Sequence, residues 1–436
     1  MAHANRPDAN GPDTSRRDSA RGAKEIYELG ELPPLGVVPQ RMHASLIRRE
    51  RFGPPSTAFQ MEQVAVPRLG HRQVMVYVMA AGINYNNVWA ALGKPIDVIS
   101  IRQKKGEPEP YHIGGSEASG IVWAVGPGVR DVQVGDRVVV SSCRWDEHAR
   151  DIRHGRDPMA SDSTSVWGYE ENFGSFAQFT CVEDFQVHPK PANLSWEAAA
   201  AYMLTGATAY RQLTHWAPHV VRPGDPVLIW GGAGGLGCMA IQLVRAFGGK
   251  PVAVVSDEEK AAYCRKLGAV GTINRHEFQH WGRLPDIDDS AAFNEWMAGA
   301  RAFGKAFWAA LGERRNPRIV FEHSGEGTIP TSMYVCDGDG MVVICGGTSG
   351  YNADVDLRFL WMRQKRLQGS HFANTQECAA ITELVARGLV DPCLSTSAPF
   401  EQVGELHQLM YENEHPPGNM AVRVNALEPG QRDVAL

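Results

Sequence analysis

The segment Pro226-Val-Leu-Ile-Trp230, followed by Gly231-Gly-Ala-Gly-Gly-Leu-Gly237, decides how the central part of this chain folds. A short apolar run before a glycine loop is typical of a buried parallel strand, and the residues from Met239 to Phe247 predict a helix after the loop. Glycines spaced as G-x-G-x-x-G allow a tight turn and let backbone N–H groups approach a pyrophosphate at a helix N-terminus. We therefore predict a dinucleotide-binding loop made of Gly232, Ala233, Gly234, Gly235, Leu236 and Gly237.

The choice between NAD and NADP depends on residues about 20 positions beyond the first glycine, where NAD enzymes usually place an acid. Here Ser256 follows the next predicted strand, Lys260 comes one helical turn later, and Arg275 follows another short strand. A hydroxyl and two cations suit a 2′-phosphate, so we predict NADPH as the cofactor. Two alternatives stay open: Asp257 takes the ribose position and selects NAD, or Lys260 belongs to a solvated helix face.

The segments on either side of this loop differ in periodicity. Upstream, short runs alternate apolar and polar residues in the manner of half-buried strands, namely 42–47, 60–67, 73–80, 120–126 and 135–140. Downstream, a helix over 258–267 is interleaved with strands at 251–255, 272–273, 318–321 and 341–344. This alternation predicts an α/β protein in which a β-rich domain accompanies a doubly wound parallel sheet of the Rossmann type. A helix over 377–387 and a strand over 420–424 are expected to return the chain to the β-rich domain.

These patterns also suggest where the parts of the chain begin and end. We predict a disordered tail over residues 1–25, a β-rich domain formed by 26–205 and 369–436, and a cofactor domain over 206–368. The cofactor domain carries an insertion near 280–316 that is apolar and helical by spacing. An apolar helix face has to be buried, and the outlets are a second subunit, a substrate wall or the insertion's own domain.

Composition excludes several classes of function. The chain has 436 residues, with 43 Lys+Arg against 49 Asp+Glu and a net charge of −6, which argues against a nucleic-acid or membrane-surface partner. No stretch approaches the roughly 18 unbroken apolar residues of a membrane span, and residues 1–24 lack the apolar region of a secretory signal. Eight scattered cysteines, without the commonest zinc spacings, predict reduced thiols in the cytoplasm.

Short strings spread along the chain resemble the medium-chain dehydrogenase/reductase superfamily between residues 42 and 425. They are Ala80-Ala-Gly-Ile-Asn84, Gly115-Ser-Glu-Ala-Ser-Gly120, Val134-Gly-Asp-Arg-Val138 and Leu204-Thr-Gly-Ala-Thr-Ala209. The resemblance implies that the β-rich part is a GroES-like catalytic domain. Zinc members of the superfamily have Cys where this chain has Asn84 and His where it has Ser116, and they carry a four-cysteine lobe that is absent here. The resemblance therefore implies the zinc-free branch, with no metal, which reduces activated C=C bonds.

Longer strings are similar to the crotonyl-CoA carboxylase/reductase family. They are Asn84-Tyr-Asn-Asn-Val-Trp-Ala90, Val166-Trp-Gly-Tyr-Glu170, the stretch 258–268 and the stretch 360–372. The resemblance implies that hydride from NADPH adds to the β-carbon of crotonyl-CoA and that the resulting enolate attacks CO2, which gives ethylmalonyl-CoA. It also implies a homo-oligomer, either a tetramer or a dimer.

The same resemblance implies the catalytic residues. CO2 carries no charge, so it needs neutral donors placed where negative charge develops on its oxygens, in a site without proton donors. Asn84 and Asn86 alternate along one stretch and can face the same cleft, and an amide is a good donor and a very poor acid; which of the two meets CO2 stays open. Glu170 and His371 resemble the family residues that act through a water. Tyr169 stands where relatives have Phe, and its phenol could protonate the enolate.

Three of these side chains, taken alone, also have a purely structural interpretation. Asn84 alone could be a turn residue, Glu170 a surface acid and His371 a loop histidine. The backbone N–H groups at Tyr169 and Glu170 could add donors to the CO2 site.

A basic cluster before the C-terminal return is the last candidate site. Arg363, Lys365 and Arg366 either hold the phosphates of CoA or form a solvated basic edge. For the whole protein, the alternatives are a plain enoyl-CoA reductase without carboxylation and an NADPH-binding protein without turnover.

Overall fold

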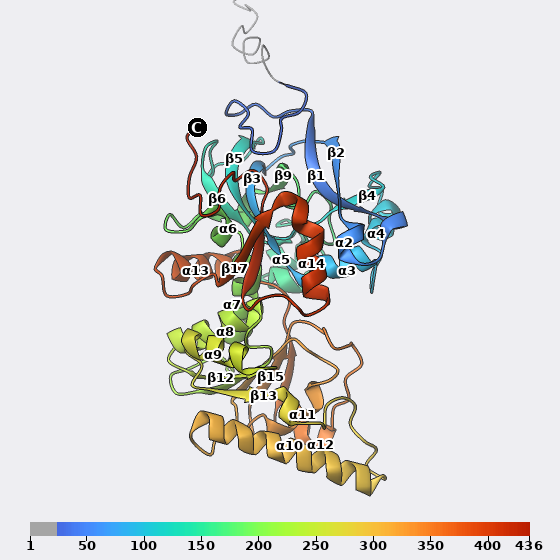
Figure 1. Cartoon of the computed structure of the whole chain (residues 1–436), viewed down its shortest axis with the longest axis vertical. Coiled ribbons are helices and arrows are strands. Elements are labelled where there is room, and N and C mark those ends of the chain that lie inside the picture. Colours follow the sequence, from blue (N-terminus) through green and yellow to red (C-terminus); the bar gives the residue numbers. More distant parts are fainter. Residues whose placement is uncertain (1–23) are drawn as a thin grey trace, which may run out of the picture.

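The computed structural model describes residues 24–436, which form two parts built on two large sheets (Figure 1). The tail predicted over residues 1–25 lies outside the described residues except for its last two positions. No helix among residues 24–436 combines the length and the apolar character needed to cross a membrane.

The upper part in Figure 1 is the β-rich one. Its seven-stranded sheet has the order β10 (Val187–Pro189), β6 (Arg137–Val140), β5 (Ala118–Val125), β3 (Gln73–Ile83), β18 (Asn419–Arg423) and β17 (Leu394–Pro399), with β9 (Phe179–Glu183) also paired to β3. A three-stranded sheet contains β2 (Gln60–Ala65), β1 (Arg41–Arg48) and β4 (Tyr111–Ile113), and a ribbon joins β7 (Cys143–Arg144) to β8 (Ser165–Val166). The longer helices here are α3 (Tyr85–Leu92), α4 (Val98–Lys104), α13 (Thr375–Ala386) and α14 (Val403–Tyr411); the short ones are α2 (Pro55–Ala58), α5 (Arg150–Arg153) and α6 (Trp196–Ala199).

Strand β18 brings the C-terminal part of the chain back into this sheet. It pairs antiparallel with β3, with Met420 opposite Ile83 and Arg423 opposite Ala80. It also pairs parallel with β17. Strand β3 is buried along nearly its whole length because the sheet is covered on both faces.

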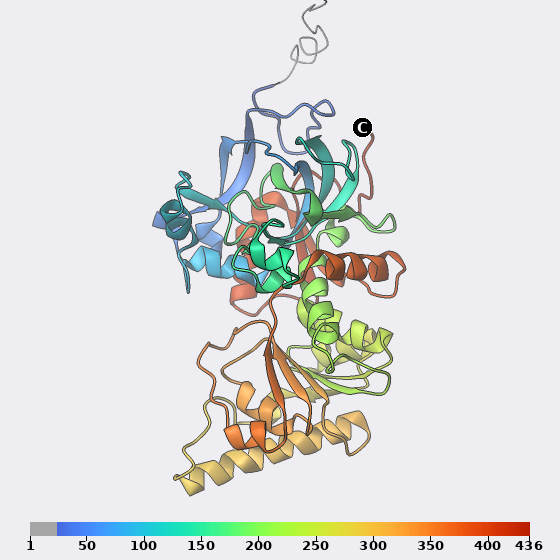
Figure 2. The same cartoon turned by 180° about the vertical axis from the view of Figure 1, so that it is seen from behind.

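The lower part is a six-stranded parallel sheet (Figures 1 and 2). Its order is β13 (Gly271–Asn274), β12 (Lys250–Val255), β11 (Pro226–Ile229), β14 (Ile319–Glu322), β15 (Met341–Ile344) and β16 (Arg366–Gly369). Its helices are α7 (Met203–Thr214), α8 (Gly235–Ala246), α9 (Glu258–Leu267), α10 (Ser290–Leu311), α11 (Ile329–Val335) and α12 (Leu357–Trp361).

Both faces of this parallel sheet are covered by helices. Along β11, Val227 and Ile229 belong to the core shared with α7, α8 and α13, whereas Leu228 and Trp230 belong to the core shared with α10 and α11. Successive strand residues point to opposite faces, so a continuous apolar strand is what two covered faces require. The predicted doubly wound α/β fold is therefore confirmed.

The apolar insertion packs on its own domain. Helix α10 runs along the sheet (Figures 1 and 2) and buries Trp296, Phe303 and Phe307 at helical spacing. The ring of Phe303 stacks on Trp230 of the sheet with 5.4 Å between ring centroids. The apolar spacing predicted a helix with a buried face. The sheet covers this face at Phe303 and Phe307, whereas Trp296 packs in a smaller cluster with Tyr334 of α11 and Phe359 of α12.

Candidate active site

The glycine loop lies between β11 and the N-terminus of α8. A Cβ on Gly232 would fall 2.6 Å from the Cβ of Ala253, and a Cβ on Gly237 would fall 2.3 Å from the carbonyl oxygen of Gly231. A Cβ on Gly234 would meet nothing closer than 3.5 Å. The outer two glycines therefore allow strand and helix to pack, while the middle one faces open space at a helix N-terminus, which fits a dinucleotide pyrophosphate.

Two of the three residues proposed for the 2′-phosphate, Ser256 and Lys260, meet just beyond the carboxyl end of β12. The ammonium of Lys260 lies 3.1 Å from the hydroxyl of Ser256. Asp257 caps helix α9, because its Oδ1 accepts the N–H of Lys260 at 2.9 Å and its Oδ2 accepts the hydroxyl of Ser256 at 2.7 Å. Arg275 is exposed just after the neighbouring strand β13. The carboxylate of Asp257 is thus used by the helix cap, and the cation and hydroxyl next to it are the groups suited to a phosphate.

The two candidate asparagines lie at the beginning of a helix, not along an extended stretch as the sequence had suggested. Asn84 is the N-cap of α3 and Asn86 belongs to its first turn. Both side chains are buried, and they bind consecutive residues of one loop. The Nδ2 of Asn84 donates to Glu117 at 2.6 Å, and the Nδ2 of Asn86 donates to Ser116 at 2.7 Å.

A third asparagine completes this amide cluster. Asn87 donates to the Oδ1 of Asn86 at 3.0 Å, and its own Oδ1 accepts the N–H of Gly115 at 3.0 Å. The amide of Asn86 is therefore held at both ends, by Asn87 and by Ser116. The sequence assigned Asn87 no role, and it marked Ser116 only as the position where zinc members of the superfamily have His, because their contacts to Asn86 depend on how helix and loop pack together.

Glu117 is fully buried among neutral groups. Its second carboxyl oxygen accepts the N–H of Leu204 at 2.9 Å. Burial raises the pKa of Glu117 to about 7, and hydrogen bonds from Leu204, Asn84 and Met203 oppose that shift. The sequence placed Glu117 inside a superfamily string but showed no reason to assign it a role.

The segment with Tyr169 and Glu170 packs directly on the loop that holds the asparagines. A Cβ on Gly168 would fall 1.9 Å from the carbonyl oxygen of Gly115, so the two loops touch through their backbones. The carboxylate of Glu170 accepts the N–H of Val166 at 2.8 Å. The backbone N–H groups of Tyr169 and Glu170 both donate to the carbonyl of Val166, and their role as further CO2 donors stays a prediction.

Both side chains of this segment have raised pKa values. Burial, with a smaller contribution from Glu170, raises the pKa of the Tyr169 phenol to about 12. Burial also raises the pKa of Glu170, and its hydrogen bond from Val166 opposes the shift. Glu170 still has a solvent-accessible side, so it lies at the rim of the site and not in its interior.

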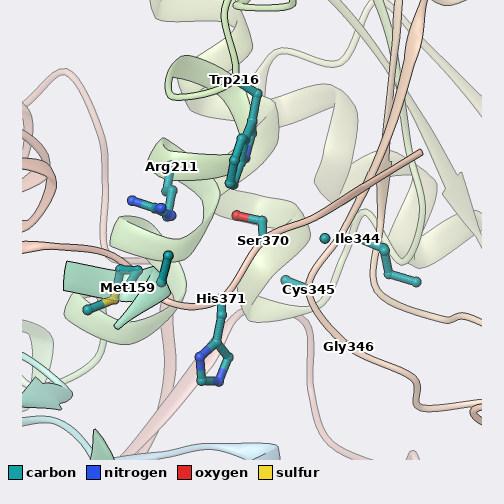
Figure 3. A pocket seen from close by; sticks show the side chains of 10 residues that line it. Met159, Arg211, Trp216, Ile344, Cys345, Gly346, Ser370 and His371 are labelled. Atoms are coloured by element: carbon teal, nitrogen blue, oxygen red, sulfur yellow. The ribbon is translucent and has the colours of Figure 1, made fainter. Parts of the chain in front are cut away.

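A cavity of about 440 Å³ opens at the carboxyl ends of β15 and β16, with His371 at its mouth (Figure 3). It is lined by Met159, Ala160, Arg211, Trp216, Ile344, Cys345, Gly346, Gly369, Ser370 and His371. In Figure 3 the segment 369–371 crosses between Arg211 and Met159 on one side and Ile344 and Cys345 on the other. Burial, and then the positive charge of Arg211, lower the pKa of His371, which favours the neutral imidazole near neutral pH.

Arg211 is itself held by two carboxylates. Its guanidinium donates to Glu377 at 2.9 Å and to Asp157 at 2.6 Å, and His215 bridges the same two acids. Nothing in the sequence pointed to Arg211, because its two carboxylate partners, Asp157 and Glu377, come from distant segments of the chain. His371 is tied to the Tyr169 segment through Phe372, since Phe372 and Tyr169 pack on one small core.

The basic cluster does not converge on one point. Lys365 donates to the carbonyl oxygens of Met333 and Tyr334, at 2.6 and 3.1 Å, at the end of α11. Arg366 lies over the ring of Trp216, 5.6 Å from its centroid, and so approaches the cavity wall. Arg363 is exposed. Their proposed role in binding CoA stays a prediction.

Comparison with known proteins agrees with this arrangement. Residues 70–192 match the family described as alcohol dehydrogenase GroES-like domain, and residues 235–387 match the family described as zinc-binding dehydrogenase. The crotonyl-CoA carboxylase/reductase of Cereibacter sphaeroides is 49% identical over 412 residues, which cover 94% of this chain and 94% of that protein. The crotonyl-CoA reductase of Streptomyces collinus is 37% identical over 399 residues, covering 89% of this chain and 86% of that protein.

A solved structure is similar over nearly the whole chain. The crotonyl-CoA carboxylase/reductase AntE, in complex with NADP, shares 65% identity, with a TM-score of 0.91 over 93% of this chain and 100% of that chain. These matches confirm the GroES-like and Rossmann-type parts expected from the sequence.

The contacts at the end of β12 lead to a prediction about cofactor choice. Replacing Lys260 by Ala is expected to weaken NADPH binding by about tenfold or more, since a charge-assisted contact to a phosphate is lost. NADH binding should change by no more than about twofold, because NADH has no 2′-phosphate and the half-buried ammonium of Lys260 then keeps only its contacts to Ser256 and Asp257, at 3.1 and 3.4 Å. Fluorescence titration with both cofactors measures this. Lys266→Ala, an exposed cation later in the same helix, is the control; equal loss for NADPH and NADH in the Lys260 variant would contradict the assignment.

Proposed function

This chain belongs to the crotonyl-CoA carboxylase/reductase family of the medium-chain dehydrogenase/reductase superfamily, and we propose that it catalyses the NADPH-dependent reductive carboxylation of crotonyl-CoA to ethylmalonyl-CoA. The observation that carries the proposal is the buried amide cluster of Asn84 and Asn86 beside the Tyr169–Glu170 loop. Neutral, non-acidic donors in a buried wall suit CO2, which has no charge to hold and must reach an enolate before a proton does.

The residues that hold the cofactor follow from the geometry of the loop. The N–H groups at the start of α8 bind the pyrophosphate, and Ser256, Lys260 and Arg275 surround the 2′-phosphate. Bound NADPH supplies the hydride that adds to the β-carbon of the enoyl thioester. The glycine loop and the cavity at β15 and β16 lie along the carboxyl edge of one parallel sheet, where ligands of such sheets bind.

The residues around the enolate control what it reacts with. The side-chain N–H groups of Asn84 and Asn86 donate hydrogen bonds to the oxygens of CO2 as these oxygens gain negative charge. His371, neutral because of burial and Arg211, holds a water near the same place and carries no acidic proton. Glu170, fixed to the N–H of Val166, orients that water from the rim. Together these groups stabilise charge on CO2 without offering a strong acid to the enolate.

Tyr169 favours the second candidate function, a plain enoyl-CoA reductase. Its phenol stays protonated up to a pKa of about 12, and a phenol next to an enolate is a possible proton donor. In a plain reductase, protonation of the enolate would give butyryl-CoA in place of ethylmalonyl-CoA. The fold and the cofactor are the same in both cases, so only the products separate them.

The test of the proposed function follows NADPH oxidation with crotonyl-CoA, with and without bicarbonate plus carbonic anhydrase, and identifies the products by mass spectrometry. We expect a product heavier by one CO2 and a faster reaction when CO2 is present. Butyryl-CoA alone, formed at a rate that ignores CO2, would identify the plain reductase. No oxidation of NADPH with any enoyl-CoA would indicate a protein that binds the cofactor without turnover.

The pocket residues are tested by the partition between the two products. Asn84→Leu, Asn86→Leu and His371→Asn should each raise the share of butyryl-CoA, by about tenfold for the amide that contacts CO2, since a donor to a developing charge is lost. Tyr169→Phe should lower that share because a proton donor is removed. Asn294→Leu, an exposed amide on α10, is the control. An unchanged partition in the first three variants would remove those residues from the site.

We also propose that the chain forms a homo-oligomer through the outer edge of β16. This strand ends the parallel sheet, and no strand within residues 24–436 pairs with its outer side. The neighbouring helix α12 exposes Leu357 and Trp361, and the residues after it expose Met362 and Leu367. Open strand edges and clustered exposed apolar side chains both favour pairing with a second copy.

The assembly is tested by multi-angle light scattering. We expect a dimer or a tetramer for the wild type and a smaller species for the double variant Trp361→Glu and Met362→Lys, because charges would enter the contact. Leu389→Glu, at an exposed leucine after α13, should leave the mass unchanged. A monomeric wild type would contradict the proposal.

All eight cysteines are free in the structure, which suits the reducing cytoplasm that we propose as the site of the reaction.

A further inference from the structure

Glu117 is a buried carboxyl group that has no cationic partner within residues 24–436. Its residue is 1% exposed, and the donors to its two oxygens, the side chain of Asn84 and backbone N–H groups, are neutral. Taking a carboxyl group out of water among neutral groups is costly even when it is hydrogen-bonded. A carboxyl group buried at this cost is expected to have a function. Its hydrogen-bond partner Asn84 belongs to the proposed CO2 pocket.

The backbone around Glu117 leaves room for its side chain only. A Cβ on Gly82 would fall 2.2 Å from the Oε1 of Glu117 and 2.4 Å from the carbonyl oxygen of Ala200. The carboxyl group therefore occupies a slot between β3 and the residues that follow α6. Because the backbone of Gly82 and Ala200 confines the carboxyl group of Glu117, its Oε1 is held in one position relative to Asn84.

The contact restricts how the amide of Asn84 can be oriented. Both oxygens of Glu117 accept hydrogen bonds, one from the Nδ2 of Asn84 at 2.6 Å and the other from the N–H of Leu204 at 2.9 Å, so the N–H2 end of Asn84, and not its oxygen, faces Glu117. One N–H is then bound, and the second has a fixed direction. Asn86 does not need this help, because Asn87 and Ser116 hold both ends of its amide. Asn84 has no second side-chain partner among the described residues, so its orientation depends on Glu117.

We propose that Glu117 is a positioning residue that holds the amide of Asn84 with its free N–H in the pocket, and thereby sets how the enolate divides between CO2 and a proton. This inference rests on the proposed function. Glu117 does not touch the substrate; it acts through Asn84. A glutamine at this position can either accept from or donate to the amide, so it permits both orientations of Asn84 while keeping the size of the side chain.

The test compares product partition in wild type and in Glu117→Gln at fixed CO2. We expect the ratio of ethylmalonyl-CoA to butyryl-CoA to fall by about tenfold, the usual effect of losing a hydrogen bond to a charged group. The affinity for NADPH and the KM for crotonyl-CoA should stay within about twofold, since neither ligand contacts Glu117. A purely structural role would instead lower both product rates together and leave their ratio unchanged, which would overturn the inference.

Glu197→Gln is the matched control. Glu197 is equally buried in the same part of the molecule, but its carboxylate binds Ser397 and the N–H of Gly430 and not a pocket amide. Its product ratio should equal that of the wild type; a fall as large as in Glu117→Gln would overturn the inference. If Glu117→Gln does not fold, Glu117→Asp withdraws the carboxylate by one methylene and serves the same comparison. If the wild type forms only butyryl-CoA, the proposed function is wrong, and the inference about Glu117 that rests on it is wrong as well.

Discussion

The contact between the glycine loop and the returning C-terminal segment holds this molecule together. The N–H of Gly418 donates to the carbonyl of Ala233 at 2.8 Å, and the next residue, Asn419, donates to Pro392 and accepts from Thr205. A Cβ on Gly235 would fall 1.9 Å from the side-chain oxygen of Asn419. The cofactor loop is thus fastened to the strand, β18, that also pairs with β3. Because of this link, the end of β3 and the amides that follow it face the cofactor domain.

The proposed CO2 pocket depends on having neutral side chains around the reacting atoms. Asn84 and Ser116 stand at the positions where the zinc members of the superfamily have Cys and His, and the amides of Asn84 and Asn86 bind Glu117 and Ser116. Arg211 has its charge matched by two carboxylates, and burial, with a smaller contribution from Arg211, keeps the pKa of His371 low. Neutral donors and a neutral imidazole can stabilise charge on CO2 while they withhold protons. Tyr169 is the one residue of the set whose proton competes with this arrangement.

Several elements could be predicted closely, and the errors have physical reasons. The helix 258–267 was predicted at its observed bounds because its cap, its apolar spacing and its final glycine agree. Helix α8 begins at Gly235 and not at Met239, because the last glycines of the loop already form its first turn. Asn84 and Asn86 were expected to alternate along one stretch, but Asn84 directly precedes helix α3 and Asn86 lies in its first turn. The side chain of Asn84 makes no capping hydrogen bond and binds Glu117, a partner that local spacing does not reveal. The backbone donors at Tyr169 and Glu170 are used by Val166, a turn that periodicity does not reveal.

The sequence by itself determined the fold class and the glycine loop, and it predicted the side chains for the 2′-phosphate and the pair of amides, because each depends on residues close together in the chain. Only the tertiary structure decided how those side chains are held. Glu117 and Asn84 are 33 residues apart and Arg211 and Glu377 are 166 apart, and these pairs form because separate loops and helices pack together. Local spacing carries information on strands, helices and turns, whereas a buried carboxyl group finds its partner only when the sheets and loops around it have closed.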